Sequence, residues 1–133
     1  MQGFFWAGAD IETANTARAG TGTKVIGIEV TKGERGWLEE VIWQSLGTNA
    51  VCVGRLFLNN GSDPANAKNN FLLPETALPA TTASNTARVA EQRKTMNIEL
   101  KEGDKLYASV SVDLTASAGY RVGVNIGEFG SDF

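Results

Sequence analysis

Residues 37–60, WLEEVIWQSLGTNAVCVGRLFLNN, hold two apolar runs on either side of the turn-forming residues Gly47-Thr48-Asn49. The second run, 51–59, is rich in β-branched and aromatic residues and is too short and mixed for a helix, which predicts a strand. We therefore expect a long central hairpin, whose two strands fold back over a shared core. The first run also fits a helical stripe, and periodicity alone leaves that alternative open. The stripe consists of Trp37, Leu38, Val41, Ile42 and Leu46.

Apolar residues at every second position predict further strands on both sides of this stretch. Residues 24–30 alternate in this way, and Phe71-Leu72-Leu73, stopped by Pro74, predicts a short edge strand. Residues 76–90 predict a long loop with a weak strand at most. The last third of the chain alternates most clearly, with inward positions at Met96, Ile98, Leu100, then Leu106, Ala108, Val110, Val112, then Tyr120, Val122, Val124 and Ile126.

This pattern predicts an all-β fold, a two-sheet antiparallel sandwich or jelly roll of about eight strands. Residues 10–23, DIETANTARAGTGT, are small and polar and predict a mobile or surface-laid connection. We expect an N-terminal segment or arm at 1–23 and a single β-sandwich domain at 24–133.

The composition describes a globular chain without a strong charge. Hydrophobic residues make up 42% and charged residues 20% of the 133 residues, and the formal net charge is -3. This balance gives no electrostatic reason to expect nucleic acid or an anionic membrane as a partner. No apolar run approaches the roughly 18 residues of a membrane span, and the N-terminus does not resemble a secretory signal. We expect neither kind of segment.

The sequence has no histidine and one cysteine, Cys52. The commonest general base and zinc ligand are therefore missing, and no internal disulfide can form. Cys52 stands between Val51 and Val53, which predicts a small buried hydrophobe. We expect no catalytic residue, no metal, no cofactor and no enzymatic activity.

Four patterns in the sequence give only weak signals for a functional site. Glu39 and Glu40 are adjacent, so strand alternation predicts that they face opposite sides and cannot act as a pair. Residues 19–24, AGTGTK, fail the spacing of a phosphate-binding loop. Residues 59–70 are rich in side-chain oxygens, which suits a hydrogen-bonded turn or, as an alternative, a calcium ion. The basic residues Arg88, Arg93 and Lys94 have no aromatic residue among them to stack on bases.

Aromatic residues stand near both ends of the chain. They are Phe4-Phe5-Trp6 at one end and Phe129 and Phe133 at the other. Bare aromatic side chains cost solubility, so these residues either pack into the core or are buried against another subunit. Phe4-Phe5-Trp6 fits a first strand or an arm that docks on a neighbour.

Four segments give the chain a resemblance to small virion proteins of tailed bacteriophages. They are VCVGRLFLNNG (51–61), FLLPETALPATTASNTA (71–87), LKEGDKLYASVS (100–111) and GEFGSDF (127–133). The order is similar: a strand with Arg-Leu-Phe and a polar loop, an apolar strand with a Pro/Thr/Ser-rich loop, and a last strand closing on Gly-Asp and an aromatic. Ser131 departs from that closing motif, and the first 36 residues carry no part of the likeness.

The resemblance implies a head decoration (cement) protein, a homotrimer that binds the major capsid protein. It would lie in the host cytoplasm before assembly and afterwards on the capsid surface of the virion. Two alternatives are a tail or fibre component and a carbohydrate-binding β-sandwich module, which an exposed Trp37 and Trp43 on one sheet face would support. The candidate contacts with capsid or sister subunits are Phe4, Phe5, Trp6, Thr81, Thr82, Asn85, Phe129 and Phe133.

Overall fold

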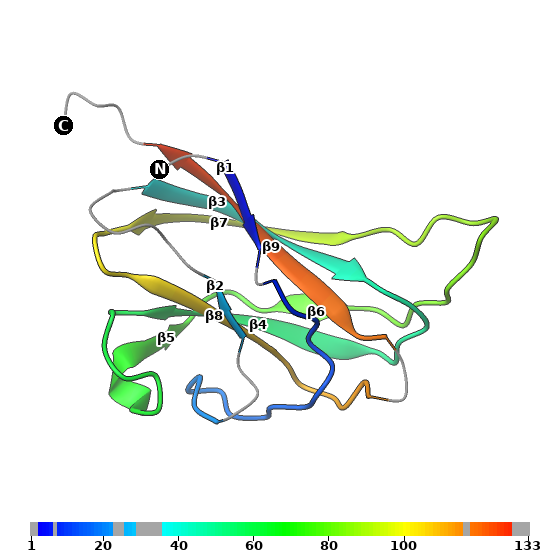
Figure 1. Cartoon of the computed structure of the whole chain (residues 1–133), viewed down its shortest axis with the longest axis horizontal. Helices are drawn as coiled ribbons and strands as arrows, with labels where there is room; N and C mark the ends of the chain where they lie inside the picture. Colours follow the sequence, from blue (N-terminus) through cyan, green and yellow to red (C-terminus); the bar gives the residue numbers. More distant parts are fainter. Residues whose placement is uncertain (1–2, 7, 23–25, 29–35, 116–117, 129–133) are drawn as a thin grey trace.

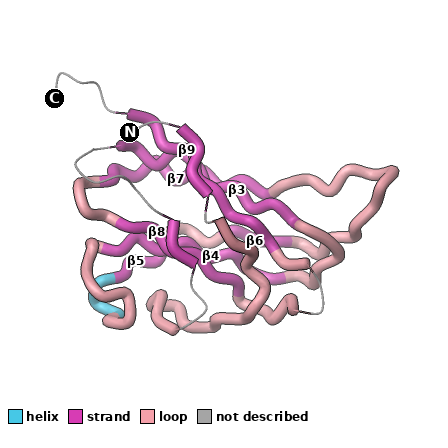
Figure 2. Tube along the Cα trace, viewed as in Figure 1, coloured by secondary structure: helices cyan, strands magenta, loops and turns pink. Residues whose placement is uncertain are grey.

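The computed structural model describes residues 3–6, 8–22, 26–28, 36–115 and 118–128 of the chain. Within these residues the chain forms two antiparallel β-sheets that pack face to face (Figure 1). Loops and a short 3-10 helix, η1, connect the strands (Figure 2). The elements are β1 (Gly3–Trp6), β2 (Ile26–Ile28), β3 (Gly36–Ser45), β4 (Cys52–Asn59), η1 (Ala67–Asn69), β5 (Asn70–Leu72), β6 (Thr76–Leu78), β7 (Gln92–Leu100), β8 (Lys105–Val110) and β9 (Tyr120–Glu128).

The strand order is that of a jelly roll. Sheet A has the order β1-β9-β3-β7, and sheet B has the order β2-β8-β4-β5, with β6 also paired to β4. The pairs β1–β9, β2–β8, β3–β7 and β4–β5 are those of one long hairpin whose tip lies between β4 and β5. Two further pairs, β9–β3 and β8–β4, form because this hairpin is rolled up on itself. The predicted fold class, a two-sheet antiparallel sandwich, is therefore confirmed.

The predicted central hairpin is wrong, because β3 and β4 lie in different sheets. The connection 46–51 crosses between the sheets and is held by Asn49. Its side chain donates to the Gly119 carbonyl (2.9 Å) and accepts from the Gly119 amide (3.1 Å). Alternating apolar residues show which face of a strand is buried but not which strand pairs with it. The hairpin in this region instead joins β4 to β5 through residues 60–69.

A β-bulge in β3 explains why this run also fits a helical stripe. The pairing with both neighbouring strands shifts register between Leu38 and Glu40. One extra residue in a strand changes the faces of all residues beyond it. Leu38 and Val41 are therefore both fully buried, at a spacing that helices and bulged strands share.

The same bulge overturns the prediction that Glu39 and Glu40 face opposite sides. The Glu40 carboxylate accepts a hydrogen bond from Asn125 (2.7 Å), and the Glu39 carboxylate lies beside Gly127. Residues 125 and 127 share one face of β9. Both carboxylates consequently lie on the outer face of sheet A, where Glu40 is also paired with Arg93 (2.7 Å).

The core lies between the sheets and follows the predicted alternation in most strands. All four predicted inward residues of β9 are buried. Val112, which was predicted to continue β8 inward, is 37% exposed because β8 ends at Val110. Cys52 is buried as predicted, and burial raises the pKa of its thiol, which disfavours the reactive thiolate. The buried β9 residues are Tyr120, Val122, Val124 and Ile126.

Residues 8–22, here called the strap, run from the start of β9 in sheet A onto the outer face of sheet B. Backbone bridges tie the strap to the sandwich at Ile11, which pairs with Tyr120, and at Ala14, which pairs with Val110. Ile11 is 2% exposed and belongs to the main core. The described part of the predicted N-terminal segment thus packs on the sandwich, and β1 adds a strand to sheet A. The boundary predicted between residues 23 and 24 lies outside the described residues.

The small residues of the strap permit close contact with sheet B. Gly20 lies over Phe57, an outward-facing residue of β4 that is 0% exposed. A Cβ at residue 20 would lie 2.9 Å from the Phe57 ring, and a Cβ at Gly22 would lie 2.8 Å from the Asn15 amide nitrogen. The small residues of the strap therefore let it lie close against sheet B and cover Phe57.

Candidate interaction surfaces

The outer face of sheet A carries an exposed aromatic pair. Phe4 is 55% and Trp6 53% exposed, whereas Phe5 points the other way and packs against the core. β1 pairs with β9, which places Trp6 opposite Gly123 and lets the Phe4 ring lie directly on Gly123. A Cβ at residue 123 would collide with that ring. Because Gly123 has no side chain, the Phe4 ring can lie directly against the sheet at this position of β9.

A groove of about 610 Å³ lies beside this aromatic pair. Its volume is within the usual range for small-ligand sites, about 300–1,000 Å³. Phe4 and Trp6 line one side, Ile42 and Gly123 belong to the strands beneath, and polar side chains from three strands complete it. These polar residues include Gln44, Arg93 and Arg121, and Glu91 precedes β7.

The charged side chains around the groove are paired with one another. Arg93 bonds Glu40 (2.7 Å), Arg88 bonds Glu91 (2.9 Å) and Arg121 bonds Asp10 (2.8 Å). A hydrogen bond with its own backbone, together with the charge of Arg88, lowers the pKa of the Glu91 carboxyl. The three arginines and three carboxylates sum to zero formal charge.

A second surface is the loop between β6 and β7, residues 79–91, here called the projecting loop. Figure 1 shows that it extends beyond the ends of the two sheets. Its base is fixed by Thr81, which exchanges backbone hydrogen bonds with Asn49 (3.0 and 3.2 Å). The Thr81 hydroxyl also donates to the Gly47 carbonyl (2.8 Å), and the Thr48 hydroxyl accepts from the Ala83 amide (3.0 Å). The loop is thus anchored at its base and exposed beyond it.

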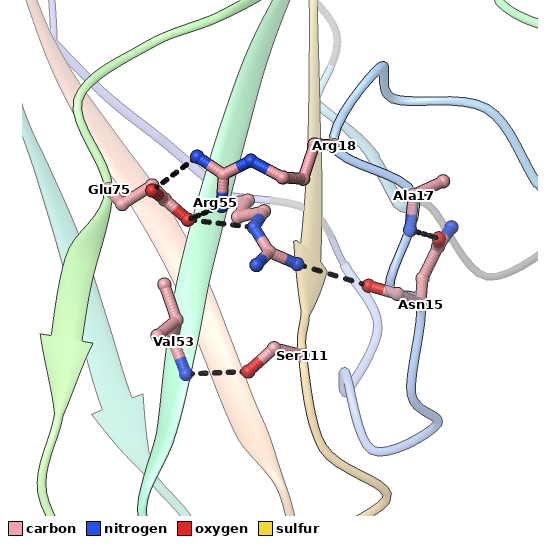
Figure 3. Close-up of polar contacts among 7 residues, drawn as sticks. All are labelled: Asn15, Ala17, Arg18, Val53, Arg55, Glu75 and Ser111. Carbon is pink, nitrogen blue, oxygen red and sulfur yellow. Dashed lines mark hydrogen bonds and ion pairs between the residues drawn. The ribbon is translucent and has the colours of Figure 1, made fainter.

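A polar cluster, here called the clasp, holds the strap against sheet B (Figure 3). The Glu75 carboxylate accepts from Arg55 of β4 (2.8 Å) and from Arg18 of the strap (2.9 Å). Arg55 is 8% exposed, and its Nη1 also donates to the Asn15 carbonyl (3.5 Å). The hydrogen bond from Arg18, followed by that from Arg55, lowers the pKa of Glu75. Since Glu75 satisfies the buried guanidinium, we assign the clasp a structural role.

The structure separates the predicted contact residues. Phe4 and Trp6 line the groove, and Phe5 faces the core. Thr81 anchors the projecting loop, whereas Thr82 and Asn85 are exposed on it. Phe129 and Phe133 lie outside the described residues.

Sequence reasoning missed the polar side of the groove. Gln44 lies within the first apolar run, and the alternation of residues 120–126 predicts only that Arg121 and Gly123 face outward. Their alternation with buried residues was visible, but the alignment of β9 between β1 and β3 was not. Trp43 is fully buried against Gly54, so Trp37 and Trp43 do not form an exposed pair.

The described residues offer no group of three or more His, Cys, Asp or Glu side chains that could hold a metal ion. Over the same part of the chain, no helix is long and apolar enough to cross a membrane. Comparisons with protein-family models, with curated proteins and with solved structures found no match.

Proposed function

We propose that this chain is a non-enzymatic decoration subunit of a bacteriophage head, which binds the outer surface of the shell and stabilises it. The partner in this proposal is the major capsid protein, and the subunits associate as a homotrimer. Support comes from the resemblance of residues 51–133 to small phage virion proteins and from the jelly-roll order of the strands. A decoration subunit of this kind needs no catalytic group.

The observation that carries the proposal is the projecting loop. Its tip is exposed and rich in small, uncharged residues, so it can be buried against another protein without leaving a charge unpaired. Its base is held by Thr81, Asn49 and Thr48. A loop that is ordered before binding loses less conformational entropy on binding, which favours affinity. We assign the capsid contact to this loop, with Thr82 and Asn85 at its exposed part.

The test measures co-sedimentation of the purified protein with heads assembled from the capsid protein of the same genome. Thr82→Arg and Asn85→Arg place a large charge in the contact, and we expect at least about tenfold weaker binding. The matched control is Ala67→Arg, at a position of η1 that is also exposed and lies at the opposite end of β4. Loop variants that bind as well as the control variant would remove the loop from the contact.

The native mass and the position on the particle test the rest of the proposal. Light scattering of a homotrimer would give three times 14.2 kDa. If light scattering gives the mass of a monomer, the trimer forms only on the capsid lattice. Gold-labelled antibody should mark the head of the particle, whereas label on the tail would replace the decoration function with the tail or fibre alternative.

A further inference from the structure

We infer that the groove on the outer face of sheet A binds a neutral carbohydrate, through stacking on Trp6 and hydrogen bonds to Gln44 and Arg121. This inference goes beyond the proposed function and does not depend on it, because it uses the face of sheet A and not the projecting loop. Three observations carry it: the aromatic pair, the unused hydrogen-bonding groups and the balanced charge.

The aromatic side of the groove suits one face of a sugar ring. Trp6 and Phe4 are each about half exposed, so flat apolar surface remains open to solvent beside the groove. The C–H face of a pyranose is apolar and flat, and an aromatic ring carries negative charge density on its face, so the two can stack. Phe4 is held in place by its contact with Gly123, which leaves the Trp6 ring as the platform over the groove.

The polar side of the groove suits the hydroxyl groups at the edge of that ring. The Gln44 amide has no hydrogen-bond partner among the described residues, so both its donor and its acceptor are open. The Arg121 guanidinium uses Nε for Asp10 (2.8 Å), which fixes the plane of its remaining donors. A sugar hydroxyl both donates and accepts, and it can therefore use these groups without carrying charge.

The charges of the groove favour a neutral ligand over a charged one. Arg88, Arg93 and Arg121 are each already paired with a carboxylate at 2.7–2.9 Å. A phosphate or carboxylate ligand would compete with the carboxylates already paired with these arginines, and a cationic ligand would compete with the arginines for those carboxylates. A hydroxyl-rich ligand leaves every pair intact, which selects it among polar ligands.

The experiment titrates the protein with neutral linear oligosaccharides built from glucose, mannose, galactose or N-acetylglucosamine. Binding is followed by calorimetry and by protection of tryptophan fluorescence from iodide. Trp6 is the most exposed of the three tryptophans, and Trp43 is fully buried, so protection reports mainly on Trp6. We expect at least one probe to bind, with Trp6→Ala about tenfold weaker and Trp6→Phe close to wild type.

Matched variants separate the groove from unspecific effects. Phe71→Ala removes an aromatic side chain that is 70% exposed on sheet B, and it should leave sugar binding unchanged. Gln44→Ala should weaken binding about threefold or more, while urea unfolding confirms that each variant is folded.

Three results would overturn the inference. The first is a folded protein that binds no neutral probe at millimolar concentration. The second is sugar binding that Trp6→Ala does not change. The third is an occupant of another class: salt-sensitive binding of heparin at the groove, or self-association that Trp6→Ala abolishes. The loop variants Thr82→Arg and Asn85→Arg test the proposed function separately. They should lose capsid binding and keep sugar binding, because residues 82 and 85 do not line the groove.

Discussion

Gly20 in the strap lies against the ring of Phe57 in β4, so closely that a Cβ at residue 20 would be 2.9 Å from the ring. Phe57 faces away from the main core and is nevertheless 0% exposed, because the strap covers it. The strap is therefore part of the folded structure, and its contribution to stability can be measured.

The first prediction concerns Gly20→Ala. Gly20 has φ +75°, and alanine in that region costs about 1–2 kcal/mol. The clash with Phe57 adds to this cost, so we expect a total loss of about 3 kcal/mol in the free energy of unfolding. Gly8→Ala is the matched control, since Gly8 has φ +73° and no atom within 4 Å of its added Cβ. Equal losses for the two variants in urea unfolding would show that the strap does not press on Phe57.

The second prediction concerns the pH dependence of the clasp. Its two arginines hold the pKa of Glu75 below the unfolded value of about 4.3. The clasp therefore contributes stability above about pH 4.3 and loses it as the pH falls through the lowered pKa. Glu75→Gln should cost about 2 kcal/mol at pH 7, between the values for exposed and buried pairs, and almost nothing in strong acid.

The control for the clasp is Arg18→Ala. Arg18 has a side chain that is 61% exposed, so its loss should cost less than about 1 kcal/mol. Unfolding of all three proteins across the acid range measures these differences. A Glu75→Gln deficit that stays constant with pH would show that the carboxylate charge does not hold the clasp.

The third prediction compares two adjacent threonines. The Thr81 hydroxyl donates to Gly47 (2.8 Å) and accepts from the Asn49 amide (3.1 Å), whereas Thr82 is exposed. Thr81→Ala should lower the free energy of unfolding by about 1–3 kcal/mol, because it removes both of these partly buried hydrogen bonds. Thr82→Ala should leave stability unchanged. Similar unfolding curves for both variants would place the anchor of the projecting loop elsewhere.

The fourth prediction concerns Cys52. Its side chain is buried in the core, and burial raises the pKa of the thiol. We expect a thiol reagent at pH 8 to label the native protein only as fast as it unfolds, and to label it quickly in urea. Fast labelling of the native protein would show that this end of the core opens.

The fold class was predictable because apolar residues stand at every second position of β9. These residues, Tyr120, Val122, Val124 and Ile126, are all buried. The bulge at Glu39 was not predictable, since one inserted residue makes a bulged strand look like a helix. The sequence also does not show which strands pair with each other. The turn signal at Gly47 was correct as a change of direction, but a reversal between sheets and a reversal within a sheet have similar sequences.

The candidate surfaces depend on contacts between residues far apart in the chain. Arg18 and Glu75 are separated by 57 positions, and no local pattern links them. The groove joins Trp6, Gln44 and Arg121, which become neighbours only through the register of β9 with β1 and β3. Local patterns could therefore predict that Phe4 and Trp6 need a partner or a cover, but not the polar groups that stand beside them.

Electron cryomicroscopy of phage heads saturated with the purified protein would show directly whether this chain decorates the shell. We expect density for the sandwich at regular positions on the outer surface of the shell, in groups of three, with the projecting loop turned toward the capsid protein. Heads that stay bare at saturating protein, or density confined to the tail, would contradict it.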